Sequence, residues 1–120
     1  MTTDKYRQIT ANVSANLAKP RVDTPDLMRG FSALPGTATR DGALDKKTKK
    51  LIAMALSVAA RCDPCLGCHA EALVKLGATQ AKFEEMLGLC VYMGGGPSLM
   101  YADNALQAYE EFGGDRAAGA

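Results

Sequence analysis

Apolar residues recur at intervals of three and four along this chain, and this spacing limits the possible folds more than any other feature. Stretches in which apolar and polar residues alternate, as they do in half-buried β-strands, are almost absent. Prolines and glycines interrupt the periodic segments at short intervals, so each segment has the length of an ordinary helix. The sequence therefore predicts an all-α fold, a compact bundle of about five or six helices.

The boundaries of these helices follow from capping residues and helix breakers. The expected helices cover residues 4–18, 24–34, 45–61, 62–76, 79–93 and 97–112. Pro20 is expected to end the first helix and Pro35 the second, because proline lacks the amide hydrogen that a continuing helix needs. Residues 37–44 are expected to form a loop, and residues 115–120 a mobile tail. The glycine-rich breaks are too short to separate two cores, so we expect a single domain over residues 1–120.

Charge and hydropathy exclude several classes of function. The 14 basic and 13 acidic residues are interspersed and give a net charge of +1, which predicts no binding of nucleic acid. No apolar run approaches the length of a membrane span, so we expect no membrane partner. The first residues also lack the apolar core of an export signal, which favours a cytoplasmic location. Two strongly apolar helices, 45–61 and 79–93, indicate more apolar surface than a small monomer buries, and hence a homo-oligomer.

The cysteines carry the clearest chemical signal, because thiols in a reducing compartment are more often catalytic or metal-binding than structural. Cys62, Cys65 and Cys68 fall within seven residues, whereas Cys90 stands apart. On a helix, Cys62, Cys65 and His69 share one face, and the two thiols are close enough for a disulfide if Cys62 lies at the helix entry.

This arrangement predicts a reversible redox centre. A thiolate here would be stabilised by the positive end of the helix, by Arg61 and by His69 if the imidazole is protonated. We expect Cys65 to be the attacking thiolate, Cys62 the resolving thiol and His69 a general base or ion-pair partner. The reverse assignment of the two cysteines stays open.

Rival interpretations use the same side chains. Residues 65–69 have the C-x-x-C-H pattern of covalent haem attachment, but that attachment generally follows export. Cys62, Cys65, Cys68 and His69 are also ligand types for zinc or iron, although Cys68 points about 120° away from Cys62 on a helix. Three cysteines that simply pack as small apolar residues are a further alternative. We expect no bound metal and no bound cofactor.

Several segments together resemble the alkylhydroperoxidase D-like branch of the carboxymuconolactone decarboxylase family, with a family core over about residues 24–112. They are Leu-Asp-Lys-Lys-Thr-Lys-Lys-Leu-Ile-Ala at 44–53, the Cys62/Cys65/His69 spacing, Gly-Ala-Thr at 77–79 and Met-Gly-Gly-Gly-Pro at 93–97. The resemblance implies an all-helical oligomer, often a trimer or hexamer. It implies an antioxidant oxidoreductase that reduces a small hydroperoxide or disulfide and is recharged by an external dithiol, such as a lipoyl group or a thioredoxin-like protein. On that pattern Cys65 attacks the peroxide, Cys62 is its partner in the redox disulfide and His69 relays protons.

One residue departs from the peroxidase pattern of that family. The pattern carries a glutamate twelve positions before the first cysteine, where this chain has Lys50. An ammonium group cannot accept a proton as a carboxylate does, although its charge would stabilise a nearby thiolate. Glu71, Glu84 or Glu85 could replace the missing carboxylate, and Lys50 could equally be one of several solvated lysines. The family also implies an alternative, a decarboxylase-like enzyme acting on a small organic acid.

Overall fold

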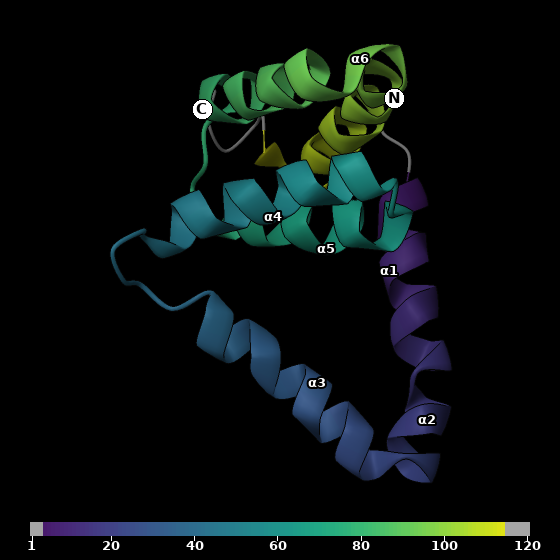
Figure 1. The fold of residues 1–120 in the computed structure, drawn as a ribbon. Helices are drawn as coiled ribbons and strands as arrows, with labels where there is room; N and C mark the ends of the chain where they lie inside the picture. The colour runs from purple at the N-terminus through teal and green to yellow at the C-terminus, as the bar shows by residue number, and fades with distance from the viewer. Residues whose placement is uncertain (1–3, 115–120) are drawn as a thin grey trace.

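The computed structural model describes residues 4–114, and within that range it contains six helices and no strands. Figure 1 shows how these helices are arranged. The helices are α1 (Lys5–Asn16), α2 (Ala18–Asp23), α3 (Pro25–Ala38), α4 (Lys46–Ala60), α5 (Asp63–Lys75) and α6 (Gln80–Glu111). The all-α prediction is confirmed. None of the described helices is both long enough and apolar enough to cross a membrane. The predicted mobile tail, residues 115–120, lies outside the described residues.

Helices α1, α4, α5 and α6 form the body of the molecule, and α5 packs against the other three. Seven large side chains are fully buried between them: Tyr6, Met54, Val58, Leu66, Leu73, Phe83 and Tyr109. Within this core the rings of Phe83 and Tyr109 stack with their centroids 4.5 Å apart. The Tyr109 hydroxyl donates a 2.6 Å hydrogen bond to the carbonyl of Ala78, which satisfies the one polar atom of that buried side chain.

Capping residues set the N-terminal ends of α4 and α6, as the sequence predicts. The Asp45 carboxylate accepts the Thr48 amide at 2.7 Å, and the Thr79 hydroxyl accepts the Lys82 amide at 3.2 Å. The predicted break at residues 94–96 is a kink inside α6, where Gly95 has φ 71° and ψ −154°. Glycine adopts this conformation without a steric penalty, and the chain resumes its helix directly afterwards.

The predictions for Pro20 and Pro35 as helix terminators are wrong. Pro20 lies in the first turn of a short helix, α2. Amide groups in the first turn make no hydrogen bond within their own helix, so a proline costs no such bond there. Pro35 lies inside α3, which continues to Ala38, so residues 37 and 38 are helical rather than part of a loop. The Pro35 carbonyl accepts the Thr39 amide at 3.0 Å, which closes the last turn of α3.

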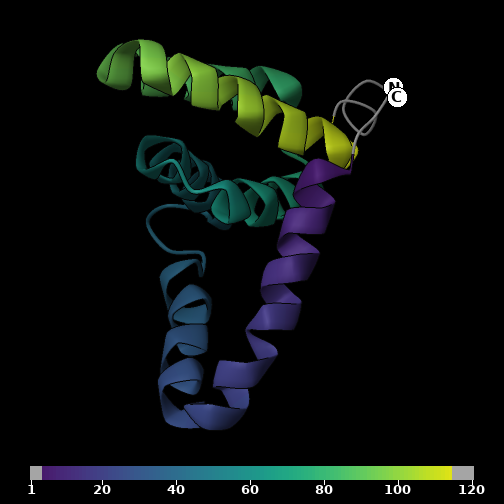
Figure 2. The same ribbon diagram turned by 90° about the vertical axis from the view of Figure 1, so that its right-hand side faces the viewer.

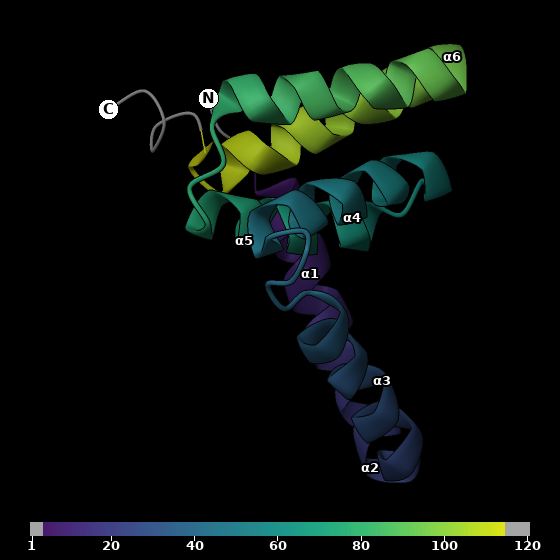
Figure 3. The same cartoon turned by 60° about the vertical axis from the view of Figure 1, so that its left-hand side comes forward.

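Helices α2 and α3 stand away from the body, as Figures 2 and 3 show. Among the described helices α3 packs only against α2. Its apolar side chains Leu27, Phe31 and Leu34 are 69%, 65% and 59% exposed and share one helix face. The body exposes a second apolar surface, where Ile52 and Leu89 help to line a cavity of about 630 Å³ between α4 and α6.

We predict that the apolar face of α3 is covered by a second copy of the chain. Phe31→Glu would then place a charge in an apolar interface and lower the molar mass measured by light scattering. Ser32→Glu is the matched control, because Ser32 is an exposed neighbour that points about 100° away around the same helix. A wild-type protein that is monomeric at all concentrations would contradict the prediction, and so would a Phe31→Glu variant of unchanged mass.

Candidate redox site

The turn between α4 and α5 presents the two cysteines at the start of a helix. Arg61 takes the left-handed conformation, φ 56°, and ends α4. The Cys62 amide donates to the Ser57 carbonyl at 3.1 Å, which ties the turn to the preceding helix. Pro64 lies in the first turn of α5, where proline fits a helix, so the chain changes direction between Cys62 and Asp63.

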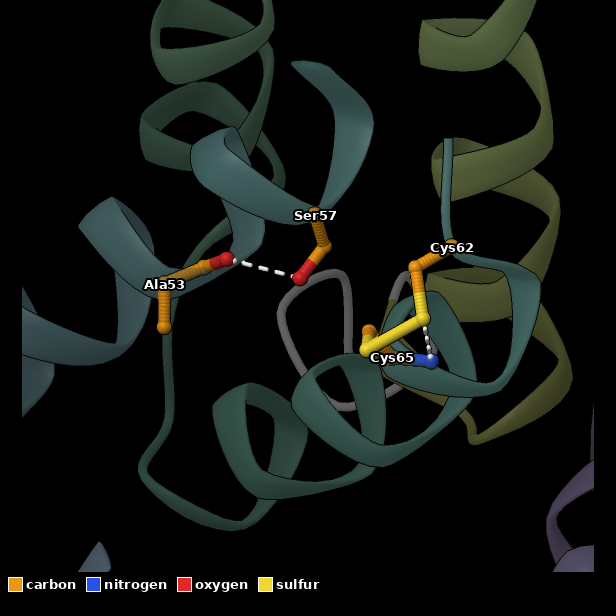
Figure 4. Close-up of a disulfide and its surroundings, with 4 residues drawn as sticks. All are labelled: Ala53, Ser57, Cys62 and Cys65. Carbon is orange, nitrogen blue, oxygen red and sulfur yellow. Dashed lines mark hydrogen bonds between the residues drawn. A yellow bond between two sulfur atoms is a disulfide. The ribbon is translucent and has the colours of Figure 1, made fainter. Parts of the chain in front are cut away.

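Cys62 and Cys65 form a disulfide across the first turn of α5, as Figure 4 shows. Their Cα atoms are 5.2 Å apart, and both residues are partly exposed. The Cys62 sulfur also accepts the Cys65 amide at 3.4 Å, so it occupies the N-cap of the helix. Backbone amides and the helix dipole at this position stabilise negative charge, which a thiolate carries once the disulfide is reduced.

His69 lies one turn after Cys65 on α5 and is half-buried. Burial lowers the pKa of His69, and the positive charge of Lys50 lowers it further. Both effects favour the neutral imidazole, so this side chain is suited to accept a proton rather than to stabilise a thiolate as a cation. This differs from the expectation that a protonated His69 would assist the thiolate.

Lys50 lies on the side of α4 that faces α5, so it is more than one of several solvated lysines. It is half-buried on α4, and its charge acts on both His69 and Cys68. With Lys46, Lys75 and Thr39 it lines a cavity of about 300 Å³ beside α5. The residue at the position of the expected glutamate is therefore close to the site, but it brings a cation there.

The three carboxylates that could replace that glutamate have different surroundings. Glu71 is half-buried, lies 4.0 Å from the ammonium of Lys75, and its charge raises the pKa of Cys68. Glu84 is exposed on α6 and accepts a hydrogen bond from Gln80 at 3.1 Å. Glu85 lines the cavity between α4 and α6, whose walls contain neither cysteine of the disulfide nor His69 or Lys50.

The two remaining cysteines are free thiols in different surroundings. Cys68 is exposed, and partial burial of its thiol raises the pKa, with Glu71 adding to the effect and Lys50 opposing it. Cys90 is half-buried against the Met86 and Ala55 carbonyls, and burial raises its pKa. Within residues 4–114 no group of three histidine, cysteine or carboxylate side chains is placed to hold a metal ion.

A contact between Tyr6 on α1 and Asp63 on α5 at this site has no signature in the sequence. The Tyr6 hydroxyl donates to an Asp63 carboxylate oxygen at 3.2 Å, across 57 residues of sequence. Burial raises the pKa of Tyr6, and the negative charge of Asp63 raises it further, so the hydroxyl stays a donor. The position of Asp63 between the two cysteines was visible in the sequence, but no local pattern indicated its partner.

Comparison with known proteins agrees with this architecture. Residues 25–108 match the carboxymuconolactone decarboxylase family. The chain belongs to that family. A crystal structure of a family member from Legionella pneumophila, in its apo form, is 59% identical and superposes with a TM-score of 0.89. The alignment covers 92% of this chain and 98% of the Legionella chain.

Three further relatives are more distant in sequence. An uncharacterized protein of Cupriavidus necator is 34% identical over 110 residues, which cover 92% of this chain and 96% of the relative. An uncharacterized protein of Haemophilus influenzae is 33% identical over 109 residues, covering 91% and 96%. A third relative, uncharacterized protein 4 in the cox locus of Paracoccus denitrificans, is 34% identical over 84 residues, covering 70% and 76%.

The pKa of His69 can be tested directly, because it is the chain's only histidine. In untagged protein we expect its NMR titration to give a pKa below the ordinary value of about 6.5, and Lys50→Gln to raise it. The unfolded state then binds the proton more readily, so the free energy of unfolding should fall as the pH drops below that ordinary value. Lys47→Gln, on the same helix, is the control and should leave the titration unchanged. An unshifted histidine in the wild type would contradict the prediction.

Proposed function

We propose that this member of the family is a thiol-dependent peroxidase of the alkylhydroperoxidase D-like branch, which reduces small hydroperoxides through Cys62 and Cys65. The observation that carries the proposal is the Cys62–Cys65 disulfide at the N-terminus of α5, with His69 one turn further along. An external dithiol, such as a lipoyl group or a thioredoxin-like protein, reduces the Cys62–Cys65 disulfide back to two thiols. Disulfide substrates would use the same two thiols.

The proposed reaction begins at Cys65. Its thiolate attacks the terminal oxygen of the hydroperoxide, the O–O bond breaks, and the departing alkoxide takes a proton to become an alcohol. Cys65 is left as a sulfenic acid, which the Cys62 thiol attacks to form the disulfide and release water. Two electrons thus pass from the thiol pair to the peroxide, and an external dithiol returns them by disulfide exchange.

His69 supports this cycle as a proton carrier. Its neutral imidazole accepts the proton of the attacking thiol and returns a proton to the departing oxygen. The position of Cys62 at the helix N-cap also supports the reverse order, in which Cys62 attacks and Cys65 resolves. Trapping the sulfenic acid in each single-cysteine variant decides between the two orders.

The proposal predicts that Cys65→Ser removes turnover of an organic hydroperoxide with a dithiol reductant, because the variant has lost one thiol of the cycle. Cys68→Ser is the matched control and should keep nearly full turnover, since Cys68 lies on the same helix outside the disulfide. Unchanged turnover in Cys65→Ser would contradict the proposal. If the double variant Cys62→Ala/Cys65→Ala still converts a small organic acid, that result would support the decarboxylase alternative instead.

A second prediction concerns the cation at the relay position. Lys50→Glu restores the carboxylate of the family pattern near His69 and should raise hydroperoxide turnover about tenfold. This is less than the roughly 10²–10⁴-fold that a positioned acid–base group contributes, because His69 already serves as a base in the proposed cycle. Lys50→Gln is the control, because an amide removes the positive charge without adding a proton acceptor. If Lys50→Glu turns over hydroperoxide no faster than Lys50→Gln, a carboxylate at position 50 does not assist the reaction, and the prediction is contradicted.

A further inference from the structure

The contact between Tyr6 and Asp63 joins the first helix of the body to the redox turn. Tyr6 is fully buried, and its hydroxyl donates to the Asp63 carboxylate at 3.2 Å. Asp63 is the first residue of α5, next to Cys62 at the N-cap and two residues before Cys65. A carboxylate is therefore held at the same helix end that carries the disulfide.

The position of Tyr6 is determined by contacts on both sides of α1. Its backbone amide donates to the buried carboxylate of Glu111 on α6 at 2.8 Å. On the other side α1 crosses α5 at Gly67, where a Cβ atom would lie 2.5 Å from the methyl group of Thr10 and 3.3 Å from the Tyr6 carbonyl oxygen. The glycine allows the close approach that brings the tyrosine ring to the turn.

The Asp63 carboxylate competes with a thiolate for the same stabilisation. Backbone amides and the helix dipole at the start of α5 favour one negative charge, and Asp63 already supplies one there. A second negative charge on Cys62 or Cys65 is repelled by it, so the reduced pair is less stable than it would be beside a neutral residue. Dithiols whose reduced form is less stabilised have lower reduction potentials.

We propose that Asp63, held in place by Tyr6, lowers the reduction potential of the Cys62–Cys65 pair and so favours the disulfide. The half-reaction consumes two electrons and two protons, breaks the S–S bond and forms two thiols. The inference rests on the proposed function, because it specifies how readily the same pair accepts electrons from the external dithiol. Asp63 and Tyr6 are positioning residues in this scheme, and the sulfur atoms carry the reaction.

The test is the reduction potential of purified protein, measured by equilibration with glutathione buffers and thiol alkylation. Asp63→Asn should shift the equilibrium about tenfold toward the dithiol, which corresponds to about 30 mV for a two-electron couple. The shift should grow from neutral to mildly alkaline pH, where more thiolate is present. Asp26→Asn is the matched control, because it removes the same charge from the first turn of α3. Helices α2 and α3 form an arm that stands away from the body.

The role of Tyr6 is tested by Tyr6→Phe, which keeps the buried ring and removes the hydroxyl. Without that hydrogen bond the carboxylate is no longer held at the helix end, so Asp63→Asn should change the potential less in the Tyr6→Phe background. Circular dichroism of each variant confirms that the helices are intact.

Each outcome separates the inference from the proposed function. Equal potentials in wild type and Asp63→Asn would overturn the inference, as would an equally large shift in Asp26→Asn or an undiminished effect in the Tyr6→Phe background. The measurement uses no hydroperoxide, so a wild type that shows the predicted shifts but reduces no hydroperoxide contradicts the proposed function alone. A wild-type pair that never forms a disulfide contradicts both.

Discussion

Burial of one face of α5 determines where Cys65 and His69 lie relative to the core. Leu66, Ala70 and Leu73 are fully buried and recur at helical spacing, and each buried leucine contributes roughly 1.5–3 kcal/mol to stability. This packing sets the rotation of the helix about its axis. Cys65 and His69 each precede a buried residue by one position, so they fall at the margin of the core and are half-buried. Reactive groups at such a margin are partly desolvated and still accessible to substrate.

The charges around this margin are unequally distributed. At the start of α5 the Asp63 carboxylate lies between the two cysteines of the disulfide and accepts the Tyr6 hydroxyl, whereas further along the helix the charge of Lys50 acts on His69 and Cys68. The cation and the burial of His69 both favour a neutral imidazole. A lysine at the position of the family glutamate therefore adds to the effect of burial in lowering the pKa of His69, in addition to removing a carboxylate. In the proposed cycle the neutral imidazole then serves as the base.

Helix α1 connects two parts of the molecule that look independent in the sequence. Its first turn is anchored in the body, where Glu111 accepts the amides of Tyr6 and Arg7, at 2.8 and 3.4 Å. Its far end leads into the arm of α2 and α3, whose apolar face is exposed in a single chain. The tyrosine beside the redox turn and the pair of helices α2 and α3 are thus carried by one continuous segment of chain.

The sequence by itself determined what depends on neighbours within a turn or two of helix. Its apolar spacing, the caps at Asp45 and Thr79, and the spacing of Cys62 and Cys65 were sufficient to predict the helices of the body and a disulfide at the start of α5. The roles of Pro20 and Pro35 were mispredicted because a proline ends a helix only where its missing amide hydrogen or its ring conflicts with the turn before it. Only the tertiary structure decided that Lys50 faces His69 and that Tyr6 donates to Asp63. Those contacts join different helices, and side-chain packing between helices, rather than the order of residues along either one, brings such groups together.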